Sequence, residues 1–114
     1  MGNEGAMEKK RKGPEPVKPV SHNGVRYEAV HWGKARGLEQ NGGYIAAYDD
    51  NSGQELWLLK VYDVPYDDDM EDDKQDVFIT DMRLGWFRKQ RLSVKNERNQ
   101  KYYVDLTDKS VSPA

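Results

Sequence analysis

A series of short strand-like segments, with no amphipathic helix between them, most strongly limits how this chain can fold. Each segment is rich in β-branched and aromatic residues, and turn-forming residues separate it from the next. Six such segments lie at 25–32, 44–48, 55–62, 76–84, 91–95 and 101–106. They predict an all-β fold, an antiparallel meander that closes into a small barrel or folds into a sandwich, because both arrangements limit exposed sheet edges.

Details of three segments sharpen this expectation. Residues 56–59 are apolar on both faces, which predicts a central strand covered on both sides. In 76–84, strict alternation places Val77, Ile79 and Asp81 on one face, opposite Phe78, Thr80 and Met82. The stretch 33–43 contains four glycines and is expected to be a loop. A longer helix there would change the class to α+β.

Length and composition predict one folded domain with flexible ends. The chain has 114 residues, of which 36% are apolar, below the roughly 45–50% of a typical globular domain. We assign 1–21 to a disordered basic tail with several prolines, 22–108 to the domain and 109–114 to a flexible C-terminus. The basic cluster at 9–12 resembles a nuclear localisation signal or a phosphate-binding segment, and the alternative is a solvated or expression-derived tail.

Several classes of function are excluded by what the sequence lacks. There is no cysteine, so disulfides, thiolate zinc sites and cysteine nucleophiles are excluded, and a reducing compartment is compatible with the chain. No apolar run approaches the roughly 18 residues that a membrane helix needs. We therefore expect a soluble cytoplasmic protein without a membrane span.

The stretch AYDDNSGQELW, at 47–57, has the alternating oxygen ligands of a calcium loop but the wrong spacing. Counted from Asp49 as the first ligand, Gly53 falls at position 5 and Lys60 at position 12, where an EF-hand requires glycine at 6 and glutamate at 12. The acidic segment at 66–75 fails in the same way, although weak divalent-cation binding there stays open. We expect no metal site.

The same stretch resembles the tryptophan-docking repeat of pyrroloquinoline-quinone-type β-propellers. Ala47, Asp49, Ser52, Gly53 and Trp57 stand in the order of that repeat. The nearest second candidate, at 104–110, lacks both the glycine and the tryptophan, and a propeller needs several blades, so the cofactor and the dehydrogenase activity are not expected here. The resemblance implies a hairpin with Gly53 at positive φ and Trp57 fixed in the core.

Catalysis has few candidates. His22 lies at the end of the tail and His31 in a predicted strand, and neither has a nucleophile at a recognisable spacing. No glycine-rich phosphate loop and no paired histidines for zinc are present. We expect a protein that is not an enzyme and uses no cofactor.

The charges are segregated along the chain. Between 63 and 81 there are nine acidic residues and one basic residue, and between 82 and 101 there are seven basic residues and one acidic residue. The basic half also contains aromatic residues, and the candidate binding residues are Trp86, Phe87, Arg88, Lys89, Arg91 and Lys95. The alternative is a purely structural role, in which Arg83, Arg91 and Lys95 pair with acidic residues and the aromatic residues belong to the core.

Three functions remain open at this point. The first is a non-catalytic module that binds an unknown protein partner through the patch around Trp86 or through the acidic loop. The second is single-stranded nucleic-acid binding on the basic aromatic face, which the net charge of −2 opposes. The third is a small ligand-binding or hydrolytic barrel. The sequence does not fix the oligomeric state.

Overall fold

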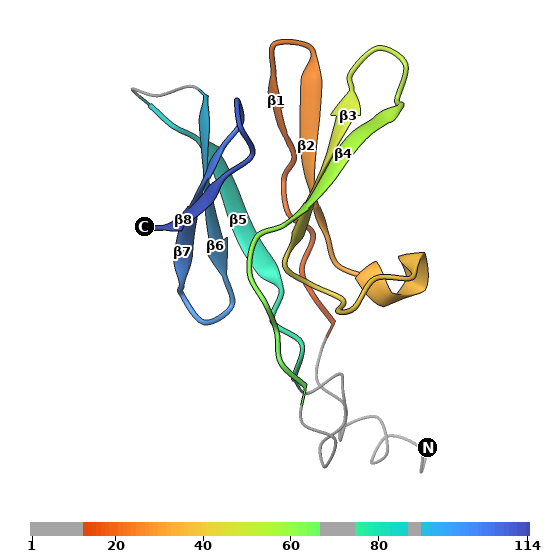
Figure 1. The fold of residues 1–114 in the computed structure, drawn as a ribbon, viewed down its shortest axis with the longest axis vertical. Coiled ribbons are helices and arrows are strands. Elements are labelled where there is room, and N and C mark those ends of the chain that lie inside the picture. Colours follow the sequence, from red (N-terminus) through yellow and green to blue (C-terminus); the bar gives the residue numbers. More distant parts are fainter. Residues whose placement is uncertain (1–12, 67–74, 87–89) are drawn as a thin grey trace.

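The structure, a computed structural model, describes residues 13–66, 75–86 and 90–114 as two four-stranded antiparallel sheets (Figure 1). The first sheet contains β1 (Val20–His22), β2 (Val25–Val30), β3 (Tyr44–Asp49) and β4 (Glu55–Lys60). The second contains β5 (Ile79–Leu84), β6 (Arg91–Asn96), β7 (Lys101–Asp105) and β8 (Val111–Pro113). Within each sheet the strands lie in chain order. The all-β prediction is confirmed, as a sandwich-like pair of sheets and not as a closed barrel.

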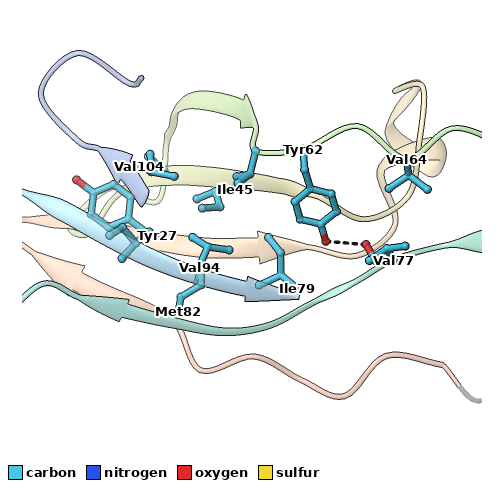
Figure 2. Close-up of a cluster of buried hydrophobic side chains, with 12 residues drawn as sticks. Tyr27, Ile45, Tyr62, Val64, Val77, Ile79, Met82, Val94 and Val104 are labelled. Carbon is cyan, nitrogen blue, oxygen red and sulfur yellow. Dashed lines mark hydrogen bonds between the residues drawn. The ribbon is translucent and has the colours of Figure 1, made fainter. Parts of the chain in front are cut away.

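One apolar cluster joins the two sheets (Figure 2). It contains Tyr27, Ile45 and Ala47 from the first sheet, Val61, Tyr62, Val64 and Val77 from the connection, and Ile79, Met82, Leu92, Val94 and Val104 from the second. Fully burying an apolar side chain of this size contributes roughly 1.5–3 kcal/mol. The cluster is therefore the main source of stability for both sheets.

The long connection between β2 and β3 is held by buried polar contacts. Its helical part is a single 3-10 turn, Gly33–Arg36. The Gln40 side chain, 3% exposed, donates from Nε2 to the carbonyl oxygens of Gly42 and Tyr62 at 2.9 and 2.8 Å. Its Oε1 accepts the Val64 N–H at 2.9 Å. The longer helix required for an α+β class is not formed, and no helix in the described part of the chain is long and apolar enough to cross a membrane.

Two short edge strands extend the paired region beyond the expected domain at 22–108. β1 pairs with β2 across Asn23 and Gly24, whose φ angles of 53° and 77° are both left-handed. Asn-Gly is a strong signal for a two-residue hairpin, so the sequence did carry a sign of β1. β8 pairs with β7, and its one apolar side chain, Val111, packs against the core. Hydrophobic alternation cannot reveal strands this short.

The prediction that residues 56–59 form a central strand is wrong. β4 is the edge of the first sheet, and Leu56 is 46% exposed. The strand covered on both faces is β3, where residues 44–47 are all buried. One face of β3 meets the core, and on the other face the backbone of Gly33 lies so close to the Tyr44 ring that an added Cβ would be 2.9 Å from it. Both strands carry apolar runs, so their patterns alone did not distinguish them.

A β-bulge corrects the predicted faces of β5. The register with β6 shifts between Ile79 and Asp81, and the extra residue, Thr80, is exposed. Because the alternation moves by one residue there, Ile79 and Met82 both face the core. The expectation that Ile79 and Asp81 share a face opposite Met82 is therefore wrong.

The hairpin predicted at 47–57 is confirmed as the connection between β3 and β4. Asp49 Oδ1 accepts the N–H groups of Asn51 and Ser52 at 2.9 and 3.0 Å. Gly53 has the predicted left-handed backbone, with φ of 76°. Trp57 is half-buried and packs against the core, its ring centroid 5.8 Å from that of Tyr27. It thus lies at the margin of the core and not at its centre.

The turn between β7 and β8 repeats this hydrogen-bonding pattern. Asp105 Oδ1 accepts the N–H groups of Thr107 and Asp108 at 2.8 and 3.3 Å. Lys109 donates its N–H to the Asp105 carbonyl at 2.7 Å, as Gly53 does to the Asp49 carbonyl at 2.8 Å. Lys109 also has a left-handed φ, of 62°. The chain is therefore two successive four-stranded meanders with the same turn before the last strand of each.

The two meanders stack front to back, which means that non-equivalent faces of the two sheets point toward the shared core. In the first, Tyr48 directly precedes the turn aspartate and lies opposite Arg26 on the outer face. In the second, Val104 directly precedes the turn aspartate and is fully buried in the core. Since side chains alternate along a strand, opposite faces of the two meanders point toward the core. The outer face of the second sheet thus corresponds to the core-facing side of the first.

Replacing Gly53 by valine is predicted to lower the free energy of unfolding by about 1–3 kcal/mol. No atom lies within 4 Å of the position a Cβ would take, so the whole effect would come from backbone strain at φ of 76°. Chemical denaturation monitored by tryptophan fluorescence measures it. Asn51→Val in the same turn, where φ is not positive, is the control, and an equal loss in both variants would contradict the explanation.

Candidate interaction surface

The outer face of the second sheet gathers charged and aromatic side chains in three rows. Residues directly opposite in antiparallel strands point to the same side of the sheet. The rows are Asp81, Lys95 and Lys101; Arg83, Ser93 and Tyr103; and Arg91 and Asp105. All of these residues are half-exposed or exposed, whereas those that alternate with them on β6 and β7 include the buried Leu92, Val94 and Val104. We call these three rows the basic face.

The acidic residues of the basic face neutralise its basic residues only in part. Four basic side chains stand against two carboxylates. Arg83 Nε lies 2.9 Å from Asp81 Oδ2, but the Arg83 side chain is 79% exposed, so the pair contributes at most about 1 kcal/mol. Lys95 lies directly opposite Lys101, and like charges in such a pair repel. An anionic group placed over this row would relieve the repulsion.

Arg91 is held by an aromatic ring on the neighbouring strand. Its guanidinium carbon lies 3.8 Å from the centroid of the Tyr103 ring. A cation over an aromatic face at this distance contributes about 0.5–1 kcal/mol at an exposed site. The Arg91 guanidinium therefore already occupies one face of the Tyr103 ring.

Of the six predicted binding residues, the structure describes three. Trp86 follows β5 and is 81% exposed. Arg91 and Lys95 lie four residues apart on β6 and therefore share the basic face. The remaining three, Phe87, Arg88 and Lys89, lie outside the described residues.

The predicted set omits three basic or aromatic members of the basic face, namely Arg83, Lys101 and Tyr103. Their basic or aromatic character is visible in the sequence, but the sequence suggests only an ion-pair role for Arg83. What places them beside Arg91 and Lys95 is the register between strands, which the bulge at Thr80 helps to set. Alternation within one strand carries no information on that register.

His31, the catalytic candidate in the strand predicted at 25–32, packs against an aromatic side chain. Its ring lies edge-on to Phe78, with centroids 5.4 Å apart, and Nε2 is 3.1 Å from the Glu15 carbonyl oxygen. Nδ1 is buried without a hydrogen-bond partner. Burial lowers the pKa of His31 below its usual 6.5, which favours the neutral ring. These contacts hold the N-terminal segment against the sheet and do not define a reaction.

No group of three metal-ligating side chains comes together within residues 13–66, 75–86 and 90–114. The Asp49 carboxylate instead serves the hairpin turn, where N–H groups of Ser52 and Asn51 lower its pKa. Most of the acidic segment, at 67–74, lies outside the described residues.

No family model matches this chain, and no curated protein matches it. Its function is therefore argued from the geometry of its surface.

Stability is predicted to fall as the pH drops below about 6.5. The folded state lowers the pKa of His31, so the unfolded chain binds a proton more readily there and gains from acidification. Denaturation midpoints at pH 7.5 and 5.5 measure the effect. His31→Gln should reduce the difference between them, while His22→Gln should leave it. An unchanged difference in the His31 variant would show that other groups govern it.

Proposed function

We propose that this protein is a non-catalytic interaction module that binds an acidic surface of a protein partner through the basic face and Trp86. The observation that carries the proposal is the exposure of Trp86. Its side chain is 81% exposed, and it follows shortly after the end of β5, a strand that contributes to the basic face. Tryptophan, tyrosine and arginine are the residue types that contribute most to the energetics of protein interfaces.

The charge arrangement supports an acidic partner. The opposed lysines Lys95 and Lys101 leave positive charge that no carboxylate in their row fully offsets, since Asp81 is also paired with Arg83. Complementary charge raises association rates and selects partners. The chain lacks cysteine, which is compatible with the cytoplasmic location that we propose for this interaction.

Single-stranded nucleic acid is the alternative ligand for the same face. Basic residues around Tyr103 favour it, because lysine and arginine bind phosphates while aromatic rings stack on bases. Against it, Arg91 already occupies one face of the Tyr103 ring, and the net charge is −2. The geometry does not favour a small ligand-binding or hydrolytic barrel, because the described strands form two open sheets.

Site-specific photo-crosslinking tests the proposal in the cells that make the protein. A photoreactive phenylalanine analogue at Ser93, in the middle row of the basic face, should yield a discrete protein adduct. The same analogue at Ser52, in the exposed hairpin turn, is the control and should not. Trp86→Ala, or joint charge reversal at Lys95 and Lys101, should reduce the adduct by about tenfold, as expected for loss of an interface anchor.

The adduct also separates the two ligand classes. Sensitivity to protease but not to nuclease supports a protein partner, and a nuclease-sensitive adduct whose yield falls steeply with salt supports nucleic acid instead. Equal crosslinking from Ser93 and Ser52 would contradict both. Trp32→Ala, which removes the other strongly exposed tryptophan of the described chain, should leave the adduct unchanged.

A further inference from the structure

A cavity of about 290 Å³ opens beside the junction of the two sheets, away from the basic face. Its lining includes Tyr62 and Val77 from the connection between the sheets, and Arg98, Gln100 and Tyr102 from β7 and the turn before it. Ligand sites are typically concave and mostly apolar with a few placed polar groups, and this volume is at the small end of their range. The space suits a ligand with one ring.

Two stacked tyrosines line this cavity. The rings of Tyr62 and Tyr102 have centroids 5.3 Å apart and an interplanar angle of 19°. The Tyr62 hydroxyl donates to the Val77 carbonyl oxygen at 2.7 Å, which fixes that ring (Figure 2). A wall whose side chains are already ordered loses little entropy when a planar ligand packs against it.

A buried asparagine holds the polar rim in place. Asn96, 1% exposed, accepts the N–H groups of Arg98 and Gln100 on its Oδ1 at 2.9 and 3.1 Å. Its Nδ2 donates to Gln100 Oε1 at 2.9 Å. The backbone that carries Arg98 is thus positioned by the fold, while the Arg98 side chain takes no part in that anchoring.

Arg98 differs from the other arginines in the described part of the chain. Arg26, Arg36 and Arg83 each form an ion pair with a carboxylate, and Arg91 lies over a tyrosine ring. Among the described residues, no carboxylate forms an ion pair with the Arg98 guanidinium and no aromatic ring lies against it. A guanidinium at the edge of a cavity binds carboxylate and phosphate groups well, because its planar N–H donors match their oxygens.

Two of the other ionisable groups that line this cavity are Asp63 and Tyr62. The Asp63 carboxylate is 2.8 Å from Lys60 Nζ, which also lies 2.6 Å from Glu39 Oε1, so one ammonium is shared between two carboxylates. Burial, the largest cause, raises the pKa of Tyr62 well above its usual value, and its hydroxyl is neutral at physiological pH. Among the described residues that line the cavity, Arg98 is the one cationic side chain, and it is the group that would bind an anion there.

We propose that this cavity binds a small organic carboxylate with one planar ring, its carboxylate on Arg98 and its ring against the pair of Tyr62 and Tyr102. The Gln100 side chain, which also lines the cavity, supplies amide N–H donors for a further polar group on the ring. This site is separate from the basic face, and it stands or fails independently of the proposed protein partner.

Titration of the full chain with benzoate, monitored by amide-resolved NMR, tests the site. Saturable shifts are expected at Val77, Arg98, Gln100 and Tyr102. Acetate lacks the ring and benzyl alcohol lacks the charge, so each should bind about tenfold more weakly or worse. Arg98→Gln should weaken benzoate binding by a similar factor, and the spectrum of the free variant verifies that it is folded.

The matched control is Arg83→Gln, the same chemical change on the basic face, which should leave benzoate affinity unchanged. Absence of saturable shifts at the cavity, or equal affinity in wild type and the Arg98→Gln variant, overturns the proposal. Shifts confined to Lys95 and Lys101 also overturn it, because they would place the anion on the basic face. Acetate binding as tightly as benzoate would refute the role of the tyrosine pair.

Discussion

Burial of one face of each four-stranded sheet against the other is the interaction on which the rest of the structure depends. Both sheets contribute side chains to one apolar cluster, and the connection from Val61 to Val77 adds side chains to the same cluster. Removing the apolar face of each sheet from water is favourable in proportion to the apolar area buried. The packing fixes which faces stay outside, and so it determines where both the basic face and the cavity beside Tyr62 lie.

The front-to-back stacking gives the basic face a second physical role. Its position corresponds to the side of the first meander that is buried, so a further sheet of the same kind would pack there. Charged residues such as Arg83 and Lys101 oppose that, because burying them unpaired is unfavourable. Repeat proteins need a polar outer face at the end of a stack in this way. The surface that ends the stack is thus also open to a partner that carries complementary charge.

Local features were predictable from the sequence, and features set by distant partners were not. The turn at Gly53 and the strand around Val94 follow from turn chemistry and alternation within a few residues. The edge position of β4 and the bulge at Thr80 depend on which strands pair, which no local pattern contains. The same division applies to the site, since the shared face of Arg91 and Lys95 follows from their spacing, whereas the rows joining them to other strands follow from register.

The contact between the sheets can be measured most directly by proton NMR of the free, full-length chain. The account predicts nuclear Overhauser cross-peaks between the rings of Tyr62, in the connection after β4, and Tyr102, on β7, whose centroids are 5.3 Å apart. It also predicts cross-peaks between the Trp57 ring and the Lys109 side chain, whose Nζ lies 5.7 Å from the ring centroid. Both sets absent, with cross-strand peaks inside each sheet present, would contradict the shared core.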